Sequence, residues 1–498
     1  MERDAVIIIG GGIGGLFCGA ILAREGFRVT LFEQHRVAGG GLHEFCRDGV
    51  SFETGMHVAG AFHPGAALHR LCTYLGIMDR LSLLPADEEC FEQFDVEGKQ
   101  YRFPRGASRL VEALAAEFPT ERENIRRHVE AMYALCDEDR LYDLRLPTPI
   151  QHAPRFARSV GEFIDASTSN ERLRSVLAFR NPLYAGDRYK TPAYIHAFVS
   201  KLYIEGSTRF VGGSRQLADA LVDVMTRAGG ELRVARGIAR VEIRDKAIDH
   251  VVSVDGERHR AAWYISSIDP RSLFDLLDRD KLQRSYCQRI DAIPSTYSAF
   301  SLFLVFKPGA FPFFNHARFY MERHEDAWRQ ADRGDKEWPR GLMCITPPET
   351  TSDRFARKMI VTCIMHFDDV RQWEHTTTGQ RGETYEAFKR EREERVITRL
   401  ERVFPGIRSC IKSAYSASPL TIRDYCKRKE GALYGFAREH DHPERSHLST
   451  RTKLSNLLFT GQNVHLHGIL GVPVTAVETC SALVGMEYLL NKINARVV

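Results

Sequence analysis

The chain has 498 residues, of which 43% are hydrophobic and 27% are charged, as is ordinary for a globular protein of two or three domains. Its 69 basic residues nearly balance its 65 acidic ones, which argues against a nucleic-acid partner. Eleven cysteines without a C-x-x-C pair, and no apolar run of about 18 residues, predict reduced thiols, no transmembrane helix and a cytoplasmic location.

The first forty residues have the order of a βαβ dinucleotide-binding unit. An apolar run over residues 4–9 leads into a glycine-rich turn, a helix-compatible run over 16–24 and a second apolar run that ends at Glu33. Glu33 follows the turn by about 20 positions, the spacing of a ribose-binding acid. The helix N-terminus offers free N–H groups and a positive dipole end to phosphates. The predicted dinucleotide site consists of Gly10, Gly12, Ile13, Gly14, Gly15 and Glu33.

Two later blocks also join short strands to glycine turns. In the middle block, a turn after residue 210 leads into an amphipathic helix, and strands are expected at 231–234, 241–243, 251–254 and 263–268. In the last block, a strand over 457–459 is followed by a turn and a helix that runs to residue 483. The chain has a single glycine fingerprint, so no separate NAD(P)H-binding domain is predicted.

The stretches between these blocks have other patterns. Residues 76–205 are mostly helical in pattern, with helices expected at 108–117 and 121–135. Residues 275–450 contain expected strands at 297–306 and 359–367 and a charged helix at 384–403. Mixed charges at helical spacing are typical of a solvated helix face.

Several segments together resemble one family. The glycine pair Gly39-Gly40 resembles the extended fingerprint of FAD-dependent oxidoreductases. Residues 33–35, 52–57, 418–421 and 431–435 resemble segments of the phytoene desaturase, carotenoid isomerase and retinol saturase group, and the retinol saturase branch fits best. Two features depart from the pattern. Gly41 stands where many relatives in the wider group have an arginine, and His465 and His467 have no clear counterpart in desaturase tails.

The resemblance implies non-covalent FAD and an α/β fold. Residues 1–75, 206–274 and 451–498 would form a three-layer Rossmann-like FAD-binding domain, with a parallel sheet and a β-hairpin crossover. Residues 76–205 and 275–450 would form a discontinuous α+β substrate-binding domain. Besides the dinucleotide residues, the FAD-binding positions implied by the resemblance are Gln34, Gly39, Gly40, Gly41, Ile238 at the adenine, Gly461 and Gln462 at the ribityl phosphate, and Leu470 and Val472 in the helix facing the flavin.

Flavin chemistry on a carbon–carbon bond needs hydride transfer at the flavin N5 and a proton at the adjacent carbon. His57, Tyr434 and His467 lie in blocks that the family places near the isoalloxazine. They are therefore candidates for acid–base catalysis, with structural hydrogen bonding as the alternative. No Ser/His/Asp triad is present, and His465 and His467 lack a third ligand at metal spacing, so no metal site is predicted.

The predicted function is FAD-dependent saturation, desaturation or isomerisation of double bonds in a polyene or isoprenoid lipid, of the retinoid or carotenoid kind. An unidentified electron donor or acceptor is implied. A lipophilic substrate favours an apolar tunnel, and the seven phenylalanines between residues 300 and 319 are either its lining or a sheet core. Phe313 and Phe314 at a membrane-touching mouth are a further alternative. A flavin amine oxidase and a non-catalytic prenyl-lipid carrier of the GDP-dissociation-inhibitor type remain as other functions.

Overall fold

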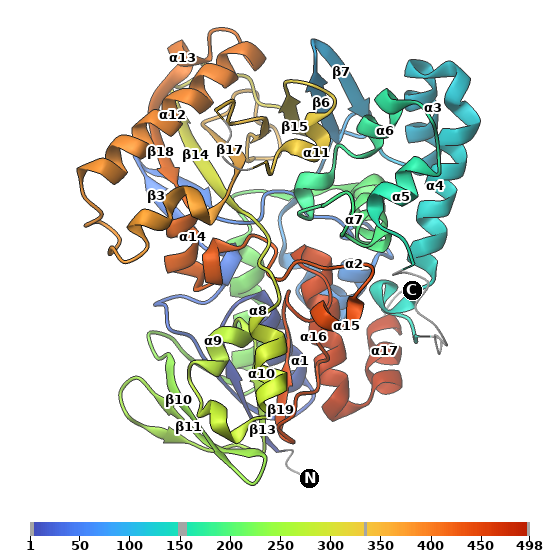
Figure 1. Cartoon of the computed structure of the whole chain (residues 1–498). Helices are drawn as coiled ribbons and strands as arrows, with labels where there is room; N and C mark the ends of the chain where they lie inside the picture. The colour runs from blue at the N-terminus through green and yellow to red at the C-terminus, as the bar shows by residue number, and fades with distance from the viewer. Residues whose placement is uncertain (1–3, 148–156, 333–335, 496–498) are drawn as a thin grey trace.

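The computed structural model describes residues 4–147, 157–332 and 336–495. Its first sheet is parallel and five-stranded, in the order β19-β13-β1-β2-β9. The strands are β1 (Ala5–Ile9), β2 (Arg28–Phe32), β9 (Glu231–Arg233), β13 (Trp263–Ser266) and β19 (Leu457–Phe459). The first, middle and last blocks of the sequence thus meet in one sheet, in the half of the molecule that holds the N-terminus (Figure 1).

The two faces of this sheet are covered by different layers. Successive residues of a strand point to opposite faces. Val6 and Ile8 pack in one core with residues of three helices, whereas Ile7 and Ile9 pack in another core with a β-meander. The helices are α1 (Ile13–Arg24), α8 (Arg215–Arg227) and α16 (Gly468–Val484), and the meander strands are β10 (Ile238–Arg244), β11 (Ala247–Ser253) and β12 (Arg258–His259). These three layers confirm the predicted Rossmann-like fold.

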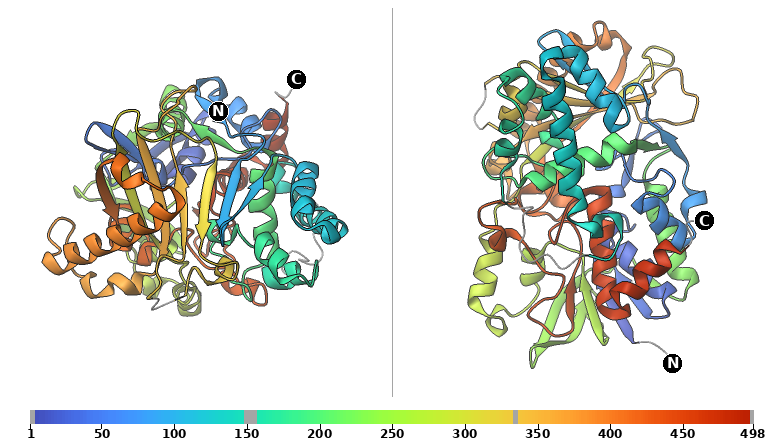
Figure 2. Two further views of the ribbon diagram at one scale, coloured as in Figure 1. Left: turned by 90° about the horizontal axis from the view of Figure 1, so that it is seen from above. Right: turned by 90° about the vertical axis from the view of Figure 1, so that its right-hand side faces the viewer.

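The second large sheet has seven strands, in the order β18-β14-β17-β16-β15-β6-β7, and lies in the other half of the molecule (Figure 2). Its strands are β6 (Glu92–Val96), β7 (Lys99–Phe103), β14 (Ser298–Phe306), β15 (Ala317–Met321), β16 (Gly341–Ile345), β17 (Lys358–Met365) and β18 (Ile411–Ala417). The charged helix α12 (Glu383–Val403) packs on this sheet through Val396 and Leu400. Five helices lie beside the end of the sheet that is formed by β6 and β7 (Figure 1): α3 (Ala107–Glu117), α4 (Arg122–Asp137), α5 (Val160–Asp165), α6 (Glu171–Leu177) and α7 (Ala193–Gly206).

The phenylalanine-rich stretch forms sheet core. Phe300, Phe306 and Phe311 pack in the core beneath α12, whereas Phe303 packs in a small core on the other side of β14. Phe319 belongs to the large helical core. Since the strand alternates its side chains between two faces, these rings do not form one continuous tunnel wall. Phe313 and Phe314 are half-buried and pack against the core beneath α12.

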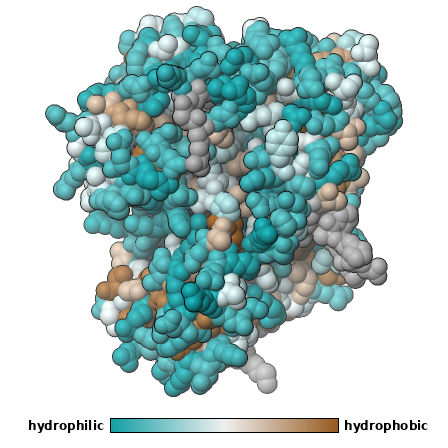
Figure 3. All heavy atoms as spheres, viewed as in Figure 1, coloured by the Kyte–Doolittle hydropathy of each residue, from teal (hydrophilic) through white to brown (hydrophobic). Residues whose placement is uncertain are grey.

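The predicted division into two domains stays a prediction, and one strand pair crosses it. β5 (Leu83–Pro85) pairs with β8 (Thr208–Phe210). The remaining elements of seven or more residues are α2 (Ala67–Leu75), α10 (Arg284–Asp291), α14 (Pro419–Cys426), α17 (Met486–Asn494) and the 3-10 helix η8 (Phe367–Trp373); the short hairpin strands are β3 (Glu44–Arg47) and β4 (Val50–Glu53). Among the described residues, no helix combines the length and apolarity that a membrane crossing requires. The face in Figure 3 is mostly hydrophilic, with apolar side chains in small groups.

Candidate cofactor and active site

The turn between β1 and α1 can be made only with glycine at two positions. Gly10 has a φ of +98°, and a Cβ there would lie 2.7 Å from Cγ2 of Ile268. A Cβ on Gly15 would lie 2.1 Å from the carbonyl oxygen of Gly10. Gly10 therefore allows the turn, and Gly15 lets the first turn of α1 pack against it.

Gly12 differs from these two glycines because it faces open space. The nearest atom to a Cβ on Gly12 would be Oγ of Ser267, at 3.9 Å. Gly12 is the N-cap of α1, makes no side-chain cap, and is followed by a first turn without an acidic residue. An open cradle before the uncapped positive end of a helix fits a pyrophosphate group.

The other glycine turns converge on this cradle. The N–H of Gly39 donates to the carbonyl of Gly11 at 2.8 Å, and a Cβ on Gly40 would lie 3.0 Å from the Cα of Gly12. On the other side, a Cβ on Gly14 would lie 3.2 Å both from the Cα of Gly461 and from Cγ1 of Val472. Backbone from all three blocks thus surrounds the N-terminus of α1, which is the arrangement that an extended dinucleotide such as FAD requires.

Glu33, the predicted ribose-binding acid, is only 6% exposed. One carboxylate oxygen accepts the N–H of Gly11 at 2.8 Å and the other accepts the N–H of His35 at 2.8 Å. Each oxygen keeps acceptor capacity for a ribose hydroxyl. Gln34 lies beside the start of β10, because a Cβ on Gly237 would be 3.1 Å from Cβ of Gln34. Ile238, the residue predicted at the adenine, follows directly.

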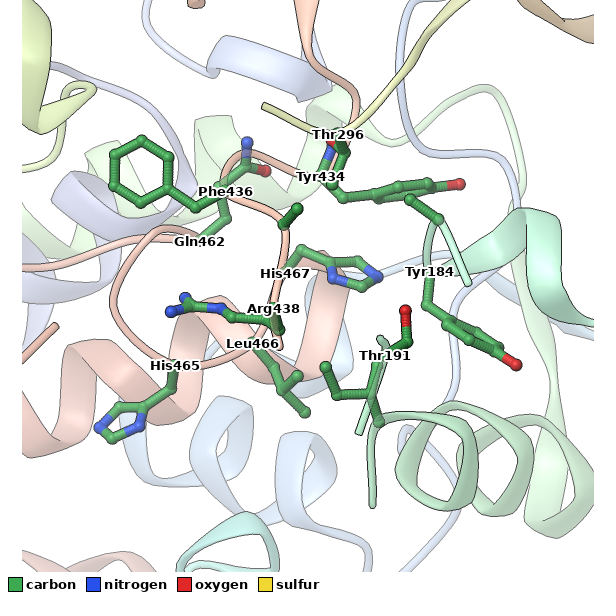
Figure 4. A pocket seen from close by; sticks show the side chains of 13 residues that line it. Tyr184, Thr191, Thr296, Tyr434, Phe436, Arg438, Gln462, His465, Leu466 and His467 are labelled. Carbon is green, nitrogen blue, oxygen red and sulfur yellow. The ribbon is translucent and has the colours of Figure 1, made fainter. Parts of the chain in front are cut away.

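Tyr434 and His467 lie side by side next to α16 (Figure 4). The Tyr434 hydroxyl donates to the carbonyl of Pro182 at 2.9 Å, and Nε2 of His467 donates to the carbonyl of Leu183 at 3.1 Å. Burial raises the pKa of Tyr434 above its ordinary range and lowers the pKa of His467 to about 4. Both side chains are therefore neutral at pH 7, and Nδ1 of His467 is the unprotonated nitrogen.

These two side chains line a small cavity of about 20 Å³. Its other walls come from Tyr184, Ala185, Thr191, Ile195, Thr296, Phe436, Ala437, Arg438, Gln462, His465 and Leu466. The lining of this cavity is largely polar, and the predicted apolar tunnel stays a prediction. The sequence analysis missed Tyr184 and Arg438, since Tyr184 lies in the helical stretch without a motif. For Arg438, the only hint in the sequence was the nearby Tyr434-Gly435 pair, which belongs to a segment that resembles the family.

His57, the third candidate, is not among the residues that line this cavity. Its Nδ1 lies 3.4 Å from one carboxylate oxygen of Glu53, and the other oxygen of Glu53 accepts the N–H of Ser214 at 2.8 Å. Nε2 of His465 contacts the carboxylate of Glu478, and the side chain points away from His467 in Figure 4. The part of the chain that the structure describes contains no cluster of three or more His, Cys, Asp or Glu side chains placed for a metal ion.

Comparison with known proteins agrees with this geometry. All-trans-retinol 13,14-reductase of Macaca fascicularis is 25% identical, with 97% of this chain and 86% of that protein aligned. Prolycopene isomerase 2 of an Oncidium hybrid cultivar is 23% identical, with 87% of this chain and 75% of that protein aligned. A solved oxidoreductase from Methanosarcina mazei has the same fold, with a TM-score of 0.65 at 15% identity, and the alignment covers 95% of this chain and 99% of that one.

The match that decides the family covers most of the chain. The model described as flavin containing amine oxidoreductase matches residues 13–483, from the first turn of α1 almost to the end of α16. This match makes the protein an enzyme rather than the prenyl-lipid carrier that the sequence left open. The chain therefore belongs to the family of flavin-containing amine oxidoreductases, and its cofactor is FAD.

Proposed function

We propose that this enzyme reduces a carbon–carbon double bond of a lipophilic polyene that ends in an uncharged polar group. The observation that carries the proposal is the match over 97% of the chain to proteins named all-trans-retinol 13,14-reductase. Prolycopene isomerase and 4,4'-diapolycopene oxygenase are also among the relatives, and their names likewise refer to polyenes. We extend the substrate class, and not the individual substrate, from those proteins to this one.

The polar cavity supports the uncharged end group. Tyr434 and His467 are neutral, and their protons are held by the carbonyls of Pro182 and Leu183. Arg438 also lines the cavity, but its guanidinium donates to the carbonyls of Ser446 and Asn463. Nδ1 of His467 is therefore available as an acceptor for a hydroxyl group. An alcohol fits this wall better than an ammonium group, because no carboxylate is among the cavity-lining residues.

FAD, when bound, supplies hydride transfer, and the protein must supply the proton. Tyr434 and His467 are poor donors, because the tyrosine hydroxyl is bonded to a carbonyl and the low pKa of His467 leaves no imidazolium at pH 7. We propose His57 as the proton donor. Its Nδ1 faces the carboxylate of Glu53, and this contact orients the imidazole. Gly55, which lies between Glu53 and His57 in the sequence, packs on the second glycine turn: a Cβ on Gly55 would be 3.1 Å from the carbonyl oxygen of Gly41.

The proposal is tested by anaerobic reoxidation of the enzyme. The FAD-bound protein is photoreduced, which replaces the unidentified electron donor, and is then mixed with all-trans-retinol, a carotene, a simple enone or buffer. We expect flavin absorbance to return with the polyene alcohol, and the product to have one double bond fewer by mass spectrometry. If none of the polyenes restores the flavin absorbance, and a primary amine reduces the oxidised enzyme, the proposal would be replaced by amine oxidation.

A further inference from the structure

The end of helix α14 reaches from the seven-stranded-sheet half of the molecule to the FAD cradle. After Cys426 the chain turns through Lys427, which has a φ of +50°, and continues to Arg428. Nε2 of His35 donates to the carbonyl of Tyr425 at 2.6 Å. The hydroxyl of Ser272 donates to the carbonyl of Lys427 at 3.5 Å. The segment that carries Arg428 is therefore attached on both sides to the half that holds the FAD cradle.

Arg428 directs half of its guanidinium at the second glycine turn. Nη1 donates to the carbonyl of Leu433 at 2.9 Å, whereas Nη2 lies 4.0 Å from the position that a Cβ on Gly41 would occupy. Among the described residues, no carboxylate forms an ion pair with Arg428, and its two hydrogen bonds, to the carbonyls of Ala432 and Leu433, both come from Nη1. A half-buried guanidinium with one free edge is a preformed site for an anion.

The charge of the cradle explains why a cation is needed there. A pyrophosphate carries about two negative charges, and backbone N–H groups with a helix dipole offset only part of them. The charged groups among the nearest atoms to the glycines of the two turns are the carboxylate of Glu33, beside Gly11, and the guanidinium of Arg428, beside Gly41. Arg428 is thus the cation that reaches this turn from another part of the chain.

We propose that Arg428 binds the pyrophosphate of FAD at the turn that contains Gly41. The proposal concerns cofactor binding and is independent of the substrate. It also makes the segment 425–428 part of the cofactor site, although the sequence places it in the other domain. FAD bound under Arg428 would hold this segment against the two glycine turns.

The proposal is tested by titrating apoprotein with FAD and following the quenching of flavin fluorescence. Arg428→Gln should weaken FAD binding by about tenfold to a hundredfold, as expected for loss of a charge-assisted bond to phosphate. ADP, which has the pyrophosphate but no flavin, should lose affinity by a similar factor. Arg428→Lys should lie between, because lysine keeps the charge without the planar fork. The control is Lys429→Gln, at an exposed neighbouring position, which should bind FAD as the wild type does.

A compensating variant separates the proposal from a general loss of stability. Gly41 does not have a positive φ, and a Cβ there meets only Arg428, so the backbone accepts Gly41→Arg. The double variant, with Arg428→Gln and Gly41→Arg, should bind FAD and ADP at least tenfold more tightly than Arg428→Gln alone. Unchanged affinity in Arg428→Gln would overturn the proposal, as would a loss that Gly41→Arg leaves uncorrected while the melting temperature of the apoprotein falls.

Discussion

The imidazole of His467 packs against the ring of Tyr434, with 4.4 Å between the ring centroids and 44° between the ring planes. Their polar tips donate to the carbonyls of two consecutive residues, Leu183 and Pro182, in the 3-10 helix η6 (Asn181–Leu183). Two segments near the C-terminus thus fix the same turn in the helical region. This relationship makes the pair a wall of the cavity.

The carbonyl of Pro182 has two donors, which leads to a prediction about stability. Tyr434 donates at 2.9 Å and Tyr297 at 3.2 Å. Either Tyr434→Phe or Tyr297→Phe should lower the free energy of unfolding by about 1 kcal/mol, because the other hydroxyl still satisfies the carbonyl. The double variant leaves the carbonyl without a donor and should cost about 1 kcal/mol more than the sum. Urea unfolding of the three variants measures this coupling, and strictly additive costs would show that the two hydroxyls act independently.

The buried imidazole of His467 predicts a dependence of stability on pH. Its pKa is about 4 in the folded protein, against an ordinary value of 6.5. Below pH 6.5 the unfolded chain therefore takes up a proton that the folded protein does not, so stability falls as the pH is lowered from 6.5 towards 4. Between pH 7.5 and 5.5 the wild type should lose about 1.4 kcal/mol at this residue.

The variant His467→Gln should lack this loss. Its deficit in unfolding free energy, relative to the wild type, should be about 1.4 kcal/mol smaller at pH 5.5 than at pH 7.5. His128 and His316 also have pKa values of about 4 and contribute equally to both proteins, so the difference isolates His467. His375→Gln, at an exposed residue, serves as the control. A deficit that is the same at both pH values would mean that His467 takes up a proton in the folded protein as readily as in the unfolded chain.

The FAD half could be predicted from the sequence because its signals are local. The turn before α1 needs glycine at fixed spacings, and each of those spacings lies within a few residues of the chain. The predicted strand over 457–459 and the helix after it are found as β19 and α16 for the same reason. A strand–turn–helix unit specifies its own backbone, so the pattern survives whatever packs around it.

The cavity could not be predicted, because its contacts join distant segments. Tyr434 and Pro182 are 252 positions apart, and Pro182 lies in a stretch without a recognisable motif. The apolar tunnel was inferred from the chemistry of the substrate rather than from residues. The phenylalanines between residues 300 and 319 could have lined a tunnel or formed a sheet core. The side chains of β14 alternate between two faces of the sheet and pack in two cores, so these phenylalanines form sheet core. The position of Arg428 at Gly41 likewise depends on how the two halves meet.

Replacing His57 tests the proposed proton donor. His57→Ala should slow reoxidation of the photoreduced enzyme by the polyene more than tenfold, with about 1.4 kcal/mol of barrier for each factor of ten. His57→Gln keeps a hydrogen bond to Glu53 without a transferable proton and should be equally slow. Stopped-flow absorbance measures both rates, with the flavin spectrum and melting temperature as controls. A wild-type rate in His57→Gln would assign His57 to the hydrogen bond with Glu53 alone.

Two glycines of the first turn should respond in opposite ways to the same methyl group. Gly12→Ala adds a Cβ whose nearest neighbour is 3.9 Å away, on a backbone with φ of −70° that alanine adopts freely. The apoprotein should fold with a melting temperature close to that of the wild type, but FAD should bind at least tenfold more weakly, because the methyl group occupies the phosphate cradle. Gly15→Ala puts a Cβ 2.1 Å from the Gly10 carbonyl oxygen and should prevent folding of the FAD half. Melting curves and FAD titrations of both variants check the pair. Wild-type FAD affinity in Gly12→Ala would mean that the pyrophosphate lies away from Gly12.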